Sequence, residues 1–282
     1  ACPLVNGIVV RNLSCRYPSG VRPALTGVSL DVPRGALAVV MGATGAGKST
    51  LARCLTRLVP AFTAAAVEGE ILLDGESIGT CAVGELAGRI GLVFQDFEAQ
   101  LFSTDVMQEM VFALEHTAVP SNQMAARVQR ALAAVGLVGF EGRDPTTLSG
   151  GEKQRLAIAG LLALRPGIMV LDEPTTDLDP RGRADVFRVL HALRDEGLAV
   201  VVIEHDPAVA VGADMLVVLD DGVVARQGSP AEFLADVAAC ERAGVRAPDV
   251  SRVFAALGLA APPLDVAQAV TRLRAAGDAP PP

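Results

Sequence analysis

The sequence predicts an α/β fold: a parallel sheet with crossover helices, an antiparallel β layer before it and an inserted α-helical subdomain. Short apolar runs alternate with helix-like patterns along the chain, and a hairpin signal lies at Asp74-Gly75. A long helical pattern separates the early strands from the late ones. The 282 residues, 51% of them hydrophobic, suffice for one large domain with a small appendix.

The first elements predict the antiparallel layer and the start of the sheet. Residues 28–32 and 71–73 are typical strands, and Asp74-Gly75 suits the positive φ of a tight hairpin. Residues 37–41 form an apolar run that leads directly into a glycine-rich segment, after which residues 49–58 have helical character. A strand, a glycine loop and a helix therefore follow one another.

The middle of the chain predicts the inserted subdomain, at about residues 97–160. A strand at 90–94 precedes a helical pattern over 106–137, in which Ser121 is available as an N-cap. Apolar residues recur there every three to four positions, at Met124, Val128, Leu132 and Val135.

Core strands return after the insertion, at 168–171, 198–203 and 215–219, and the last turns at 220–222 into 223–224. We expect the main domain to cover residues 1–238. Residues 239–282 are expected to form a helical extension, with one amphipathic stretch at Val266, Ala269, Val270 and Leu273 and a disordered tail at 280–282.

Charge and cysteine usage narrow the function. The net charge is −8, and only two of the 24 basic residues are lysines; both observations argue against a nucleic-acid surface. The alternative is a local basic patch formed by some of the 22 arginines. No run approaches the roughly 20 apolar residues of a membrane span, and no apolar leader opens the chain, so we expect a cytosolic protein. The cysteines lack metal-ligand spacing and are expected to be reduced, buried thiols: Cys2, Cys15, Cys54, Cys81 and Cys240.

Residues 42–49 fit the phosphate-binding pattern G-x-x-x-x-G-K-[ST], and the flanking strand and helix supply the context that this motif requires. Backbone N–H groups and the helix N-terminus would surround a β-phosphate. Lys48 would neutralise the β- and γ-phosphate oxygens, and Ser49 would ligate Mg²⁺. The motif predicts a P-loop nucleoside triphosphatase with a RecA-like core.

The strand at 168–171 delivers Asp172 and Glu173 at its carboxyl end. Asp172 is placed to hold Mg²⁺ through water, and Glu173 to orient or deprotonate the attacking water. An acidic pair at the end of a strand is often only a solvated turn. The phosphate loop upstream and residues 174–179 downstream favour the catalytic interpretation.

A second glycine motif, at 148–155, contains the other lysine, Lys153. It places Ser149, Gly150 and Gly151 at the start of a helix that runs through 156–164, an arrangement suited to an anion. The first motif already binds the chain's own nucleotide, so this one would serve the nucleotide of a partner chain. The alternative is an ordinary serine N-cap.

Over about residues 5–235 the chain resembles the ATP-binding cassette (ABC) ATPases, most specifically in Leu-Ser-Gly-Gly-x-x-x-Arg. The resemblance implies an adenine-stacking aromatic residue, a glutamine loop, a switch histidine and a loop that crosses a dimer interface. Tyr17, Gln95, His205 and Asp179 match these in turn. The other histidines, His116 and His191, match nothing and are expected to face solvent.

We expect the site to bind ATP and Mg²⁺ and to contain three groups of residues. The catalytic residues are Glu173, His205, Gln95 and Lys48, and the Mg²⁺ ligands are Ser49, Gln95 and Asp172. The ATP-binding residues are Tyr17, Gly42, Ala43, Thr44, Gly45, Ala46, Gly47, Lys48, Ser49, Thr50, Ser149, Gly150, Gly151 and Asp179.

The segment 94–102 with 106–113 resembles the energy-coupling factor (ECF) transporter ATPases, whose glutamine loop reads Phe-Gln-Asn-Pro-Asp-x-Gln-Leu-Phe; here Asp96-Phe97-Glu98 replaces Asn-Pro-Asp. The C-terminal segment around 262–264 resembles the extension that supports dimer contacts in that group. The resemblance implies an importer ATPase on the cytoplasmic face of the cell membrane, powering uptake of a vitamin or a transition-metal ion.

The same resemblance implies protein partners, and the acidic balance of the chain argues against nucleic acid. The partners are a second ABC ATPase chain, identical or paralogous, a transmembrane coupling subunit that docks near 95–102, and a substrate-binding membrane subunit. Two cassettes would close head to tail on two Mg-ATP. The alternatives are the ATPase of another ABC importer, for amino acids or peptides, and a soluble ABC ATPase without a transport role.

Overall fold

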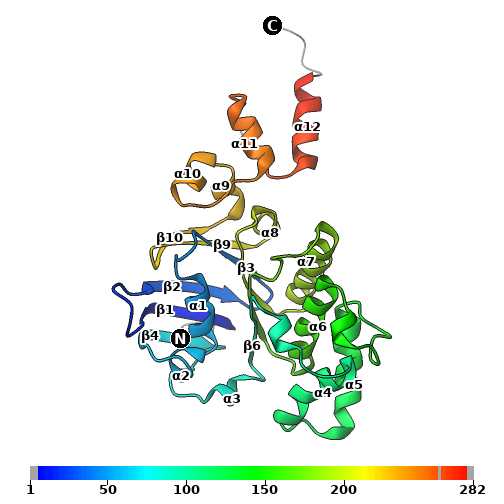
Figure 1. The fold of residues 1–282 in the computed structure, drawn as a ribbon. Helices are drawn as coiled ribbons and strands as arrows, with labels where there is room; N and C mark the ends of the chain where they lie inside the picture. Colours follow the sequence, from blue (N-terminus) through cyan, green and yellow to red (C-terminus); the bar gives the residue numbers. More distant parts are fainter. Residues whose placement is uncertain (1–5, 260–261, 278–282) are drawn as a thin grey trace.

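The computed structural model describes residues 6–259 and 262–277, and its centre is a six-stranded sheet (Figure 1). The strand order is β10 (Val223–Gly228), β9 (Met215–Asp220), β3 (Leu37–Met41), β8 (Ala199–Ile203), β7 (Ile168–Asp172) and β6 (Ile90–Val93). Neighbouring strands are parallel except for the β9–β10 hairpin. The predicted α/β class is confirmed, and these strands begin within a residue of their predicted positions.

The parallel strands are continuous apolar runs because both faces of the sheet are covered. In β3, Val39 and Met41 pack into the core on the helical side, whereas Ala38 and Val40 pack into the core on the side of the antiparallel sheet. Each core is therefore bounded by one face of the same sheet.

The antiparallel layer has the strand order β2 (Leu25–Pro33), β1 (Gly7–Arg16), β4 (Ala66–Leu73) and β5 (Glu76–Ser77). It shares its core with α1 (Lys48–Leu55), which lies between the two sheets in Figure 1. The predicted hairpin is confirmed, with φ of 51° at Asp74 and 84° at Gly75.

Strand β1 was missing from the sequence-based prediction. Its inward residues shift phase from Ile8 and Val10 to Leu13 and Cys15, because a bulge lies between Val10 and Leu13. The bulge breaks the strict alternation by which a half-buried strand is recognised.

Helix α1 is shorter than the predicted 49–58. It begins at Lys48 and ends at Leu55, because Arg57 takes up a left-handed conformation with φ of 60°. The short helices α2 (Leu58–Ala61) and α3 (Val83–Leu86) follow it.

Helices α4 (Val106–His116), α5 (Ser121–Ala134), α6 (Gly150–Ala163) and α7 (Pro180–Asp195) lie on the other side of the sheet, with the 3₁₀ turns η1 (Glu98–Gln100) and η2 (Pro145–Thr147). The predicted helical pattern over 106–137 is two helices, separated at 117–120, where Ala118 has φ of 54°. Ser121 was predicted wrongly as an N-cap: it is the first helical residue, after Pro120. Within α5, Val128 and Leu132 are buried as expected, as is Val135 just after it.

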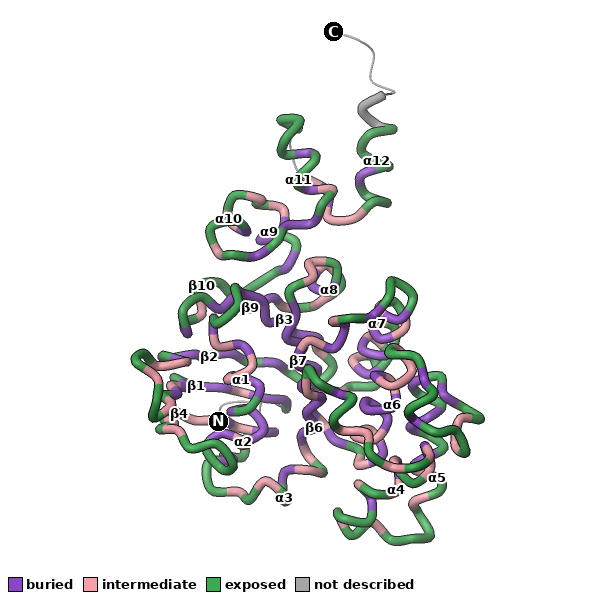
Figure 2. Tube along the Cα trace, viewed as in Figure 1, coloured by how far each residue is buried: buried purple, intermediate pink, exposed green. Residues whose placement is uncertain are grey.

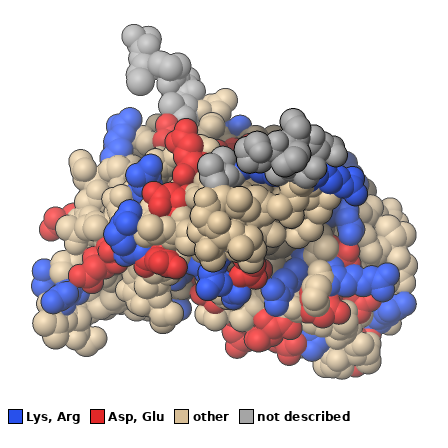
Figure 3. Space-filling view, turned by 90° about the horizontal axis from the view of Figure 1, so that it is seen from above, with Lys and Arg blue, Asp and Glu red and all other residues tan. Residues whose placement is uncertain are grey.

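Helix α8 (Pro207–Val211) lies between β8 and β9, and α9 (Pro230–Leu234) follows β10. The predicted extension contains more helices than the single expected stretch: α10 (Val237–Arg242), α11 (Asp249–Ala256) and α12 (Val266–Gly277). Of the predicted apolar stripe on α12, Ala269 is buried, but Val266, Val270 and Leu273 are exposed. Figure 2 shows much of α12 in the green of exposed residues. Figure 3 looks onto this end of the molecule and shows a broad uncharged area with acidic and basic side chains around it.

Cys15, Cys54 and Cys240 are buried free thiols, as expected, whereas Cys81 is half-exposed and corrects the prediction. Cys2 and residues 280–282 lie outside the described residues. Among the described helices, none has the length and apolar character needed to span a bilayer.

Candidate active site

The phosphate loop joins β3 to α1 and needs glycine at two close contacts. Gly42 has φ of 148°, and a side chain there would collide with the Leu219 carbonyl oxygen; Gly47 has φ of 100°, and a side chain there would collide with the Ala24 carbonyl oxygen. Both positions combine a backbone that favours glycine with a neighbouring strand or turn at van der Waals distance. The motif therefore folds as the sequence predicts.

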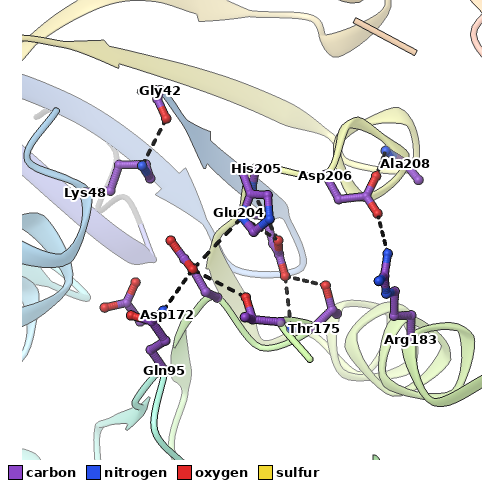
Figure 4. A network of polar contacts seen from close by, with 12 residues as sticks. Gly42, Lys48, Gln95, Asp172, Thr175, Arg183, Glu204, His205, Asp206 and Ala208 are labelled. Atoms are coloured by element: carbon purple, nitrogen blue, oxygen red, sulfur yellow. Dashed lines mark hydrogen bonds and ion pairs between the residues drawn. The ribbon is translucent and has the colours of Figure 1, made fainter. Parts of the chain in front are cut away.

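Lys48 opens α1 and turns its ammonium back over the loop. Its Nζ donates to the carbonyl oxygens of Gly42, at 2.9 Å, and Ala43, at 3.0 Å, and the residue is only 9% exposed (Figure 4). Two carbonyl oxygens thus hold the ammonium over the loop. On the same helix, Thr50 Oγ1 accepts a 3.4 Å hydrogen bond from Tyr17, the predicted adenine-stacking residue.

Ser49, in the first turn of α1, meets Asp172, the last residue of β7. The Ser49 hydroxyl donates to Asp172 Oδ1 at 3.2 Å. Burial raises the pKa of Asp172, against the lowering effects of the Ser49 hydrogen bond and the nearby Lys48. A hydroxyl and a carboxylate at one point are the hard oxygen donors that suit Mg²⁺.

The described residues contain no cluster of three or more His, Cys, Asp or Glu side chains suited to a metal.

Glu173 follows Asp172 in a left-handed conformation, with φ of 50°. Its Oε2 accepts hydrogen bonds from Gln95 Nε2, at 3.1 Å, and Thr176 Oγ1, at 3.3 Å. His205 Nδ1 lies 4.0 Å from the same oxygen. The predicted residues Gln95 and His205, from two other segments, therefore both lie near one carboxylate oxygen of Glu173. Glu173 directly follows Asp172 of the Ser49–Asp172 pair.

Glu204, next to the predicted switch histidine, was missed by the sequence analysis. Its side chain is fully buried, and its Oε1 accepts hydrogen bonds from the N–H and the hydroxyl of Thr175. Burial raises the pKa of Glu204, although these bonds oppose the rise. An acid directly after the apolar run 199–203 was the one signal available in the sequence.

Ser149 caps α6 and forms a capping box with Glu152. The Glu152 carboxylate accepts hydrogen bonds from the Ser149 N–H, at 2.8 Å, and hydroxyl, at 2.9 Å. The backbone hydrogen bond lowers the pKa of Glu152. The ordinary N-cap that the sequence left open as an alternative is thus present.

Ser149, Gly150 and Gly151 line a pocket of about 430 Å³ together with Asp177 and Asp179. Asp179 caps α7 by accepting from Gly182 N–H at 2.6 Å. No residue of the phosphate loop lines this pocket. The predicted site residues therefore form two groups in one chain: one around Lys48 and Glu173, the other around Ser149 and Asp179.

The second lysine does not point into that pocket. Lys153 Nζ forms a 2.9 Å salt bridge with Glu98 of η1, so it joins α6 to the segment after the glutamine loop. Of the two unassigned histidines, His116 is exposed as predicted. His191 is not: it is half-buried against Gly212, and burial lowers its pKa.

Comparisons with known proteins agree with this arrangement. A family model described as ABC transporter matches residues 25–176. The energy-coupling factor transporter ATP-binding protein EcfA of Methanothermobacter thermautotrophicus is 38% identical over 262 residues, which cover 92% of this chain and 82% of the relative. A putative ABC transporter ATP-binding protein of Caldanaerobacter subterraneus is 43% identical over 249 residues, 88% of this chain; the chain spans only 44% of that relative's length.

Among solved structures, cbiO1 from Clostridium perfringens, part of the ABC transporter complex cbiONQ, superposes with a TM-score of 0.74 at 30% identity. The match covers 88% of this chain and 98% of that one. From the family match, the relatives and the fold together, the chain belongs to the ABC transporter family as an ABC ATPase cassette, and it is similar over most of its length to ECF transporter ATP-binding proteins.

Proposed function

We propose that this chain is the ATP-hydrolysing subunit of an ECF-type importer and that it works as a dimer on two Mg-ATP. The observation that carries the proposal is the separation of its site residues into two groups. Lys48, Asp172 and Glu173 belong to one group, and none of them lines the pocket that contains Ser149. Two chains arranged head to tail would complete each site from both groups.

Within each composite site, Lys48 would leave its two loop carbonyls for the β- and γ-phosphate oxygens. Ser49, Asp172 and Gln95 would hold Mg²⁺, which supplies charge neutralisation of the phosphate oxygens when it is bound. Glu173 would orient the attacking water and accept its proton, and His205 would contact the γ-phosphate. Catalysis would come mostly from positioning and charge stabilisation.

ATP would drive transport because it binds the closed dimer better than the open chains, and hydrolysis removes that difference. We infer separate membrane subunits and uptake of a vitamin or transition-metal ion from the similarity to ECF transporter ATP-binding proteins and to part of the cbiONQ complex. We also propose a cassette over residues 1–238 with its helical subdomain at about 97–160, followed by a dimer-supporting extension.

The test of the base is Glu173→Gln. This variant should bind ATP, lose at least 100-fold in turnover and elute as a dimer with ATP in size-exclusion chromatography, because the amide keeps the shape but does not accept the proton. Glu196→Gln, after the end of α7, is the matched control and should behave as the wild type. A monomeric Glu173→Gln variant with full ATPase activity would show that the base assignment is wrong.

A docking surface for the transmembrane coupling subunit is proposed at η1 and the residues after it. A cavity of about 200 Å³ there is lined by Leu101, Phe102 and Pro145, among others. Phe102 is 62% exposed and packs edge-on against Phe112, with ring centroids 4.7 Å apart. A coupling helix that inserts an apolar side chain would cover these rings.

Replacing Leu101 and Phe102 by glutamate should release the membrane subunit while sparing ATP binding. Phe62→Glu is the matched control, since Phe62 is another exposed phenylalanine, 76% exposed, and it lies at the end of α2, which does not line this cavity. The readout is co-purification of the membrane subunits from detergent extracts. Unchanged co-purification of the double variant would remove this surface from the proposal.

A further inference from the structure

Glu204 is a buried carboxylate at the end of β8, next to His205 in sequence and 3.8 Å from its Nδ1. It has no exposed surface, whereas the side chain of the adjacent His205 is 63% exposed. Figure 4 shows it between the end of β8 and the loop that leaves β7. Taking a carboxyl group out of water is costly unless its hydrogen bonds are satisfied, so its partners define its role.

The carboxylate connects two loops. Oε1 accepts hydrogen bonds from the Thr175 N–H, at 3.0 Å, and from the Thr175 hydroxyl, at 2.6 Å. Oε2 accepts the backbone N–H of His205 at 3.2 Å. Strands β7 and β8 are neighbours, with Asp172 paired to Ile203, so the two loops begin side by side.

Thr175 lies two residues after Glu173, whose left-handed backbone requires support. A residue other than glycine keeps such a conformation only when its surroundings hold it there. The Glu173 N–H donates to the Ile203 carbonyl oxygen at 2.9 Å, which secures one side of the turn. Glu204 secures the other side through Thr175.

The same carboxylate also sets the start of the switch loop. Its bond to the His205 N–H fixes the backbone from which the imidazole projects, and His205 Nδ1 then lies 4.0 Å from Glu173 Oε2. A single buried side chain thus controls the backbone on both sides of the place where Glu173 and His205 meet.

We propose that Glu204 is a positioning residue for ATP hydrolysis. By accepting hydrogen bonds from Thr175 and from the His205 N–H together, it keeps the Glu173 carboxylate and the His205 imidazole in their positions relative to each other. The inference rests on the proposed roles of Glu173 and His205. Glu204 itself touches neither nucleotide nor water in this role.

The first test is Glu204→Gln in the full chain, with steady-state ATPase kinetics, ATP affinity and melting temperature measured together. Its amide oxygen still faces Thr175, but its NH₂ group then opposes the His205 N–H, a donor against a donor. We expect kcat to fall at least tenfold, with less than a twofold change in ATP affinity and a melting temperature within a few degrees of the wild type.

The second test is carried by Thr175, so it holds even if Glu204→Gln fails to fold. Thr175→Val keeps the side-chain shape and loses the hydroxyl donor, and it should lower kcat as Glu204→Gln does. Thr175→Ser keeps the hydroxyl and should retain wild-type kcat. The double variant Glu204→Gln/Thr175→Val should be no slower than the slower single variant, because both changes break one link.

Two results would overturn the inference. One is wild-type kcat in both Glu204→Gln and Thr175→Val. The other is a fall in kcat together with equal losses of ATP affinity and melting temperature, which indicates a structural role only.

Glu173→Gln separates the role of Glu204 from the proposed function. If that variant keeps its ATPase activity the proposed base is wrong, whereas if it is inactive while Glu204→Gln is not, only the role of Glu204 fails.

Discussion

At the scale of single residues, chemistry in this molecule depends on backbone states that only neighbouring contacts hold in place. Glu173 and Asp177 both have positive φ, in one loop after β7. For L-residues this conformation costs roughly 1–2 kcal/mol each. The sequence motifs directly predict the site residues Lys48, Ser49, Asp172 and Glu173. The role of Glu204 was not predictable from the sequence, because it depends on hydrogen bonds to Thr175, which lies 29 positions away in the chain.

Ser149 offers a test at this scale, because its hydroxyl is an N-cap whether or not it also contacts a nucleotide. Ser149→Ala should lower the free energy of unfolding by about 1 kcal/mol through loss of the cap and should abolish ATP-driven dimerisation and turnover. Ser149→Asn is the matched variant: asparagine caps as well as serine does, so stability should return, but its larger amide should leave turnover low.

Urea unfolding and ATPase assays on the two Ser149 variants separate the roles. Wild-type turnover in both would mean that the serine is a cap and nothing more.

At the scale of helices and strands, the predictions were correct for the strands that are buried on both faces. These parallel strands are apolar on both faces, so each one is an uninterrupted apolar run in the sequence and its first and last residues are easy to recognise. Three failures have physical causes: a bulge shifts the phase of β1, Pro120 starts α5 in place of Ser121, and a left-handed residue, Ala118, divides the helical pattern after α4. Each cause is a local backbone geometry that hydrophobic periodicity does not encode.

Asp74 makes a pH-dependent test of the antiparallel layer. It accepts the Gly7 N–H at 2.9 Å and a two-point contact from Arg34, which joins β1, the turn after β2 and the β4–β5 hairpin. The Arg34 hydrogen bond lowers the pKa of Asp74 below its usual 3.8, against the effect of burial. The folded state therefore gains stability above pH 3.8, and this gain is lost as the pH falls through the lowered value.

Asp74→Asn should lower the free energy of unfolding by about 1 kcal/mol at pH 7 after allowance for solvent screening, and the difference from wild type should shrink below pH 3.8. Urea titrations across the pH range measure both. Asp221→Asn is the control, since its pair with Arg22 is largely exposed and should be worth little at any pH. A difference that stays constant with pH would contradict the role of the charge.

At the scale of the whole molecule, one sheet separates two cores, and the two groups of site residues lie apart in the same chain. Three surfaces are those that we propose to meet other chains: the pocket at Ser149, the aromatic residues Phe102 and Phe112, and the exposed stripe of α12. The predicted fold class is confirmed as a whole. Which surfaces meet other chains was not predictable from periodicity, which indicates an apolar face but not what covers it.

The stripe of α12 gives a test at this scale. Val270 is 40% exposed and Leu273 52% exposed, so replacing both by glutamate should leave the melting temperature of the monomer unchanged. If the extension supports the dimer, the ATP-dependent dimer of the Glu173→Gln variant should weaken at least tenfold, because two charges would be buried in the interface. Arg272→Glu, between them in sequence, is the control; sedimentation with ATP measures the effect.

The scarcity of lysine has one more consequence. Both ammonium groups are engaged, Lys48 with the carbonyls of the phosphate loop and Lys153 with Glu98. Apart from three histidines, the remaining basic side chains of this sequence are arginines, whose guanidinium groups keep their charge. Acetylation removes the charge of a lysine. In this sequence it would therefore act at only two positions: one where nucleotide is expected, and one where α6 is tied to the surface proposed to meet the membrane subunit.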